Sequence, residues 1–187
     1  MAIKTFTTGE VLTAADTNTY LANSGLVYVT SAVVGSGVST ITFNNCFSST
    51  YDAYKIVYSG GKTSANGNIS LKLRKSGTNS DTGYFGVLMY GSPSGSAIQH
   101  AGNDNAVGFS WIGGSEGNTT GYAQVILELN YPFATGYTAI SNASVIYSGV
   151  VGTYNGMHKV NDSYDGFQLY NLTFTGGTVT VYGYRKA

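Results

Sequence analysis

The side chains best suited to chemistry lie near one long stretch, GSPSGSAIQHAGNDNAVG, at residues 91–108. This stretch has no strand pattern, and loops of such length are usually functional or mobile. The candidate residues are an imidazole, two amides, a carboxylate and the indole that follows on the next expected strand: His100, Asn103, Asp104, Asn105 and Trp111. Sugars are bound by aromatic faces together with amide and carboxylate hydrogen bonds, so these residues are a candidate glycan contact. The alternative, which we favour, is that Trp111 fills the core and the loop is a connection or a subunit contact.

Other reactive side chains form no recognisable site. The nine carboxylates are scattered, so no pair indicates glycoside hydrolysis, and we expect no enzymatic activity. The stretch NDSYDG, residues 161–166, resembles part of a calcium loop, but Leu172 occupies the place of the bidentate glutamate. We therefore interpret it as a turn rich in Asn and Asp. A second, weaker candidate loop is GGSEGNTTGY, residues 113–122.

Cysteine and histidine are too few for a metal or nucleophile site. Cys46 is the chain's single cysteine, and we predict that it is a small buried hydrophobe. His100 and His158 lie far from it in the sequence and carry no motif. The stretch GSG at residues 35–37 is followed by no helix pattern, which excludes a dinucleotide loop. We expect no cofactor and no metal ion.

The composition narrows the range of partners. Charged residues make up 10% of the 187 residues, the net charge is +0, and Lys and Arg form no run. The electrostatic footprint of nucleic-acid binding is therefore missing. No apolar run approaches the roughly 18 residues of a membrane-spanning helix, and the N-terminus lacks the apolar region of a secretory signal. Gly, Ser, Thr, Asn and 16 Tyr supply the polarity instead, and such a surface suits a close-packed assembly.

The first 25 residues differ from the rest of the chain. In VLTAADTNTYLAN, Thr13 is a candidate N-cap and Asp16 follows three residues later. A helix of about two turns is too short to be stable alone, so it must pack on its own domain, a sister chain or another protein. Its apolar stripe would consist of Leu12, Ala15, Tyr20 and Leu21.

After Gly25 the hydrophobic period changes to two. In NISLKLRK we expect Ile69, Leu71 and Leu73 to point inward, and the stretch YAQVILELNY alternates most regularly. Nine or ten short strands at this spacing predict an all-β fold, a jelly-roll-like antiparallel β-sandwich. The expected domains are an N-terminal segment at 1–25 and a sandwich at 26–187.

The last strand pattern, TVTVYGYR, reaches almost to the final residue. Chain ends fray unless the fold holds them, so we predict that this strand lies inside a sheet. Val179 and Val181 would face the core, while Tyr182 and Tyr184 would face outward. Either this phase is misread or those tyrosines meet sister chains, and we prefer the second interpretation, because Tyr is enriched and charge depleted at interfaces. A one-residue slip of the pattern near Asn171 predicts a bulge or a tight bend.

Two parts of the sequence resemble structural proteins of tailed-bacteriophage virions. FTTGEVLTAADTNTYLANS resembles the opening of many such chains. The stretches ITFNNCFSSTYDAYKIVYSG, LKLRKSGT and DGFQLYNLTFTGGTVTVYGYRKA resemble the β-sandwich module of tail-fibre and other virion-surface proteins. The resemblance covers most of the chain, but these motifs are not catalytic signatures and do not fix one position in a virion.

The resemblance implies a compact head that is usually a homotrimer and docks onto the particle through its N-terminal segment. The chain would be located in the virion, after assembly in the host cytoplasm. No long shaft separates Ser24 from the sandwich, so the implied protein is a short tail fibre, a tail-tip knob or a capsid knob. The implied anchor residues are Phe6, Val11, Leu12, Ala15, Tyr20 and Leu21.

Three functions stay open at this point. A receptor-binding knob would attach to a bacterial surface polysaccharide, and would carry aromatic residues beside amides at the end remote from the N-terminus. A capsid decoration, baseplate or neck protein would brace neighbouring subunits, with an extensive contact made by residues 1–30 and no ligand of its own. A glycan-cleaving enzyme ranks last, since no carboxylate pair is apparent.

Overall fold

The computed structural model of the chain describes residues 7–16, 25–92, 94–95, 97–117, 122–147 and 149–186. These residues contain fourteen strands, all paired antiparallel, and one helix of three residues, α1 (Ala14–Asp16). The predicted all-β sandwich is confirmed. The expected strand number was wrong: the strands are more numerous, and β3 and β11 reach 13 residues each.

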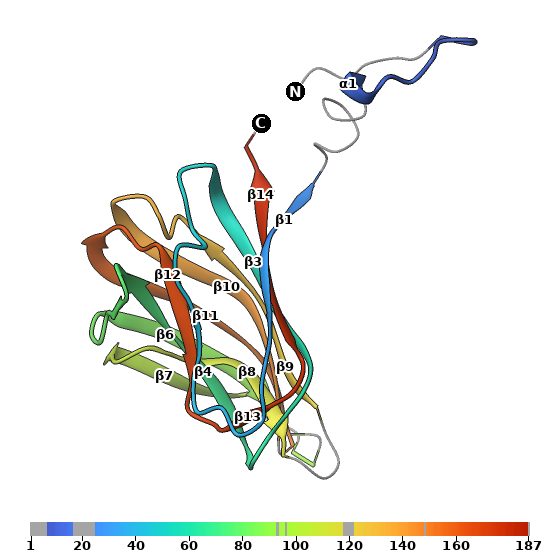
Figure 1. The fold of residues 1–187 in the computed structure, drawn as a ribbon. Coiled ribbons are helices and arrows are strands. Elements are labelled where there is room, and N and C mark those ends of the chain that lie inside the picture. The colour runs from blue at the N-terminus through green and yellow to red at the C-terminus, as the bar shows by residue number, and fades with distance from the viewer. Residues whose placement is uncertain are drawn as a thin grey trace.

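The larger layer of the sandwich contains eight strands (Figure 1). In spatial order they are β1 (Leu26–Val33), β14 (Thr178–Arg185), β3 (Tyr51–Thr63), β9 (Ala123–Asn130), β10 (Gly136–Tyr147), β11 (Val150–Asp162), β6 (Tyr84–Gly91) and β7 (Gln99–Ala106). Within the described residues, β1 and β7 each pair with a single neighbour and so form the two edges of this layer.

The smaller layer lies against it, and Figure 1 shows β4 and β12 in front of β10 and β11. Its strands, in spatial order, are β2 (Ile41–Phe43), β12 (Gly166–Tyr170), β4 (Asn66–Lys75) and β8 (Phe109–Glu116). Two short strands pair with the ends of longer ones: β5 (Thr78–Asn79) pairs with β4, and β13 (Phe174–Thr175) pairs with β3. Since Gly113 and Gly114 of β8 also pair with β9, the two layers form one continuous hydrogen-bonded network.

The core fills the space between the inward faces of the layers. Ile69, Leu71 and Leu73 are fully buried, as the alternation on β4 predicts. The same holds for the regular pattern on β9, whose inward residues are Ala123, Val125, Leu127 and Leu129. Cys46 is buried as a small hydrophobe, and desolvation raises the pKa of its thiol to about 12. A neutral thiol in this position contributes packing rather than reactivity.

Buried tyrosines occupy slots that glycines leave open. The Tyr58 and Tyr154 rings are fully buried, and their hydroxyl groups donate to Gly176 O at 2.9 Å and to Asn103 Oδ1 at 3.0 Å. A Cβ atom on Gly61 would lie 1.9 Å from the Tyr58 hydroxyl, and one on Gly86 would lie 2.2 Å from the Tyr154 hydroxyl. No side chain tolerates such short contacts, so glycine is required at the positions where a tyrosine hydroxyl touches the backbone of a neighbouring segment.

The C-terminal strand is an interior strand, as the sequence predicts. β14 lies between β1 and β3, and its register places Tyr182 opposite Tyr28 on one side and Lys55 on the other. Val179 and Val181 are fully buried, while Tyr182 and Tyr184 lie on the outer face, half-buried by their neighbours. The pattern slip near Asn171 is a tight bend, where this residue adopts a φ of 88° between β12 and β13.

The tyrosine slots make Gly86→Ala a sharp test of the packing. We expect the added methyl group to displace the Tyr154 ring and to lower the free energy of unfolding by about 1–3 kcal/mol. Gly102→Ala is the matched control on the neighbouring strand, because its Cβ would meet no atom nearer than 3.7 Å. Urea denaturation measures both variants. Equal stability of the two variants would contradict the slot interpretation.

Candidate functional site

The sequence candidate for glycan binding is not an irregular loop. Strand β7, Gln99–Ala106, occupies eight residues of the stretch 91–108 and pairs along β6. The expectation of a loop was wrong because β7 is an edge strand made of small and polar residues, whose alternation carries no hydrophobic signal. His100 and Asp104 are exposed on the outer side of β7, whereas Asn103 points toward the smaller layer.

The remaining candidate side chains hold strands together. Asn103 Nδ2 donates to Ser110 Oγ at 2.8 Å, and Gly83 N donates to Asn105 Oδ1 at 2.9 Å. Trp111 packs against the core, with its ring centroid 5.9 Å from that of Tyr154. The structure therefore does not bring the five residues to one surface, and the position of Trp111 agrees with the alternative we favoured. In the weaker candidate at 113–122, residues 113–116 belong to β8, and residues 118–121 lie outside the described part.

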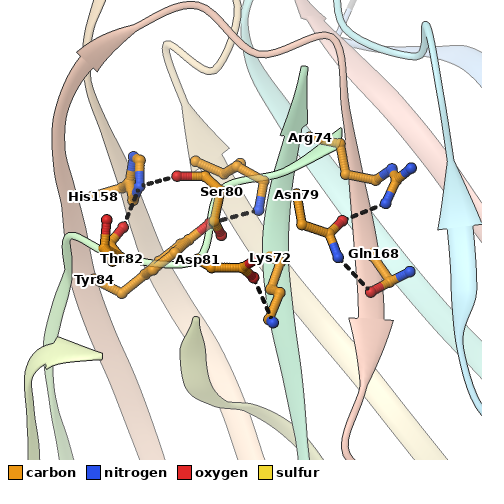
Figure 2. A network of polar contacts seen from close by, with 10 residues as sticks. Lys72, Arg74, Asn79, Ser80, Asp81, Thr82, Tyr84, His158 and Gln168 are labelled. Atoms are coloured by element: carbon orange, nitrogen blue, oxygen red, sulfur yellow. Dashed lines mark hydrogen bonds and ion pairs between the residues drawn. The ribbon is translucent and has the colours of Figure 1, made fainter. Parts of the chain in front are cut away.

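One serine–histidine pair resembles catalytic machinery, and Figure 2 shows it. Ser80 Oγ lies 3.0 Å from His158 Nε2, but the same nitrogen lies 2.9 Å from the Thr82 carbonyl oxygen. A carbonyl can only accept, so Nε2 must carry a proton and cannot take one from the serine. His158 is fully buried, with its ring between those of Tyr84 and Tyr164. We assign this pair to holding the chain between β5 and β6.

The outer face of the smaller layer is polar and internally bonded (Figure 2). Asn79 Nδ2 donates to Gln168 Oε1 at 3.0 Å, Arg74 donates to Asn79 Oδ1, and Lys72 pairs with Asp81 at 2.6 Å. We call this surface the polar face; it consists of Thr42, Lys72, Arg74, Asn79, Asp81 and Gln168. Its groups are solvated or paired with each other, as expected of a surface in contact with water.

The outer face of the larger layer has the opposite character. Apolar side chains from five of its strands are exposed there, the tyrosines of β14 are half-buried beside them, and about half of the Met89 and Val151 residue surfaces remains accessible. Met89, Ile98 and Val151 border a shallow hollow of about 380 Å³. We call this surface the apolar face; it consists of Tyr28, Val87, Met89, Ile126, Ile146, Val151, Met157, Tyr182 and Tyr184. Large exposed apolar patches of this kind mark interaction sites.

The central carboxylate of the apolar face is hydrogen-bonded by its neighbours. Glu128 accepts hydrogen bonds from Tyr184 Oη at 2.5 Å and from Asn142 Nδ2 at 3.1 Å, and Lys55 lies directly opposite on β3. The two hydrogen bonds lower the pKa of Glu128, while the bond to Glu128 raises the pKa of Tyr184 to about 12. These hydrogen bonds hold Glu128 in its ionised form, and a partner surface that covers it can leave both donors in place.

The expected anchor is described only in part. Val11 is 78% exposed, Leu12 and Ala15 are also exposed, and Phe6, Tyr20 and Leu21 lie outside the described residues. The predicted N-cap is confirmed, since Asp16 N donates to Thr13 Oγ1 at 3.1 Å and Thr13 N donates to Asp16 Oδ2 at 3.2 Å. This reciprocal pair fixes the start of α1.

Comparison of the chain with models of protein families, with curated proteins and with solved structures gave no match. In the described part of the chain, no cluster of three or more His, Cys, Asp and Glu side chains is arranged to hold a metal ion. Among the same residues, no helix has the length and apolar character needed to cross a membrane. The two outer faces are therefore the features that a functional proposal must explain.

Burial lowers the pKa of His158 below its ordinary value of 6.5. The rings around it are neutral, and the only charged neighbour acting on it, Asp162, does not offset the desolvation. Below pH 6.5 the unfolded chain thus binds more protons than the folded chain, so stability falls as the pH falls, by at most about 1.4 kcal/mol per pH unit for this group.

We expect urea midpoints measured between pH 7.5 and 5.5 to show this decline in the wild type and in His100→Gln, which alters an exposed histidine. His158→Gln should flatten the pH dependence, whatever its effect on stability at pH 7.5. An unchanged slope in His158→Gln would contradict the assignment.

Proposed function

We propose that the chain is a virion surface protein, a short tail fibre or knob whose sandwich head assembles with identical copies through the apolar face. One observation carries the proposal: the two outer faces of the sandwich differ sharply in polarity. The polar face has a self-contained network, whereas the apolar face exposes Met, Val, Ile and Tyr side chains around the hydrogen-bonded carboxylate of Glu128, with Lys55 and Lys159 among them. The resemblance of the sequence to phage virion proteins supplies the biological setting.

The chemistry of the apolar face supports burial by another protein surface. Each Å² of apolar surface removed from water contributes roughly 25 cal/mol, so leaving these side chains exposed is unfavourable. Interface cores are rich in Tyr and Met and poor in charge, which matches the composition of this face. The hydrogen bonds of Glu128 offset part of the electrostatic penalty of covering it.

Identical copies are the occupant that we favour. A closed ring of subunits would cover the apolar face and protect the edge strands β1 and β7 from open-ended pairing. A homotrimer is the assembly that the phage resemblance implies. The anchor at residues 1–25 would dock the head on another virion protein through exposed side chains that include Val11 and Leu12.

A decoration, baseplate or neck protein is the second candidate, because it needs the same self-association and anchor. The two functions differ at the end of the sandwich remote from β1's first residue. Receptor binding requires a ligand site there, and decoration does not.

A charge placed on the apolar face tests the assembly. We expect wild-type protein to sediment as an oligomer and Val151→Asp to weaken association at least about 100-fold, because the new carboxylate would be buried without a partner. Thr42→Asp is the matched control, since it puts the same charge at an exposed position of the polar face. Analytical ultracentrifugation over a concentration series measures both. A wild-type chain that stays monomeric at every concentration would refute the self-association.

Substitutions in the N-terminal segment test the anchor in the full-length chain. We expect the double variant Val11→Asp, Leu12→Asp to keep its circular dichroism spectrum and oligomeric state but to be lost from purified particles. Val107→Asp is the control, because it changes an exposed valine in the turn between β7 and β8. Immunoblots of purified particles measure incorporation. Particles that carry the double variant at the wild-type level would exclude this role of the two side chains.

A further inference from the structure

We infer that a groove at one end of the sandwich binds a neutral pyranose saccharide. The groove is shallow and open to solvent, has a volume of about 530 Å³, and is formed where three separate segments of the chain meet. Its rim carries four hydroxyl groups and one amide, from Ser39, Thr40, Ser64, Thr173 and Asn171. We call it the distal groove.

The groove lies at the end of the sandwich that is remote from the start of β1. Leu26, the first residue of β1, is opposite Tyr184, and its last residue, Val33, is opposite Thr178. The groove is at the second end, because Ser64 N donates to Thr173 O beside the β13–β3 pair. Figure 1 shows β13 at this end of the molecule and the start of β1 at the other. A chain anchored by its N-terminal segment would therefore present the distal groove outward.

The polar lining of the groove suits an uncharged ligand rich in hydroxyl groups. Ser39, Thr40 and Ser64 are exposed, and within the described residues their hydroxyls bond to no protein group, so a ligand could replace the water that solvates them. Hydroxyl groups both donate and accept, as saccharide hydroxyls do. No charged side chain lines the groove, so neither a phosphate nor a cation would find a counter-charge there.

The apolar lining suits the C–H surface of a sugar ring. Leu172 and Tyr170 lie between the polar groups in the same segment. Lys72 Nζ stands 4.9 Å from the centroid of the Tyr170 ring and is itself paired with Asp81, which holds the ring in place. Aromatic and aliphatic surface beside amides and hydroxyls is the combination that ligand pockets use to orient a small polar molecule.

Asn171 is the residue on which the groove depends. Its φ of 88° is positive, a turn conformation that asparagine tolerates well and that five other non-glycine residues of the described part also adopt. Asn171 Nδ2 donates to Asn68 O at 3.1 Å, which fixes the amide and leaves its oxygen available to accept from a ligand. The structure thus holds one acceptor at a defined position among otherwise rotatable hydroxyls.

The saccharide site rests on the proposed function, because outward presentation of the groove requires an N-terminal anchor. Asn171→Gly isolates the site without threatening the fold, since glycine adopts positive φ readily. The matched control is Asn45→Gly, which replaces another exposed asparagine with positive φ, beyond the opposite end of β2.

Saturation-transfer NMR on the full-length protein would use maltose, lactose and N,N′-diacetylchitobiose as neutral probes and 3′-sialyllactose as an anionic one. We expect saturable binding of at least one neutral probe, no gain in affinity from the sialic acid, and about fivefold weaker binding by Asn171→Gly, the effect of one or two lost hydrogen bonds. Asn45→Gly should bind as the wild type does.

The saccharide site would be overturned by the absence of saturable binding of any neutral probe, or by equal binding of the probes to Asn171→Gly and the wild type. Tighter binding of 3′-sialyllactose than of lactose would also overturn it, because the lining offers that carboxylate no counter-charge. Sedimentation of the same samples reports on self-association separately. An oligomer without saccharide binding would refute this site alone, and a monomer that binds saccharide would refute the proposed assembly.

Discussion

The close fit between tyrosine rings and glycine backbones is the constraint on which this sandwich depends. A buried phenol supplies a large apolar surface, but its hydroxyl group must find a partner, and it does so at the rim of the core. Tyr54 donates to Ser48 O and Tyr84 donates to Ser80 O, both at 3.0 Å, so each ring also fixes a loop. Glycines such as Gly183, whose Cβ would lie 2.4 Å from the Tyr51 ring, keep the space that the rings need.

This constraint relates the unusual composition to the contrast between the outer faces. Tyrosine rings pack directly against glycine backbone in the core, so in the described part of the chain the two layers pack closely without buried ion pairs. The few charged residues lie at the surface. Three of them, Lys72, Arg74 and Asp81, lie on the polar face, while Lys55 and Glu128 lie in the central part of the apolar face. The result is one surface suited to water and one suited to another protein.

Much of the fold could be predicted from the sequence because its signals are local. The buried phase of β4 and β9, the bend at Asn171 and the cap at Thr13 each depend on residues close together in the chain. The interior position of β14 depends on distant partners, and its prediction came from the strong strand pattern at a chain end, which would otherwise fray. β7 could not be predicted, since an edge strand without apolar residues has no periodic signal. The partnership of Ser80 with His158 spans 78 residues, and no local pattern reports such a contact.

The candidate surfaces could be predicted from the sequence even less well than the strands. The sequence indicates that Tyr182 and Tyr184 face outward, and the burial on β14 agrees, but their place in a face shared by six strands requires the strand order. The distal groove joins residues near 40, 64 and 171, which meet only after the layers are assembled. Taken one at a time, the hydroxyl-rich sequences of these segments predict only ordinary turns.

The direction of β1 also determines how a mechanical load would act on the head. β1 enters the body at Leu26, runs the length of the larger layer beside β14, and ends near the distal groove. Tension between a tether at Leu26 and a load at the groove would pull β1 along its own axis. The backbone hydrogen bonds to β14 would then be strained together in shear instead of being peeled open one after another, which is the more force-resistant geometry for a strand at the edge of a sheet.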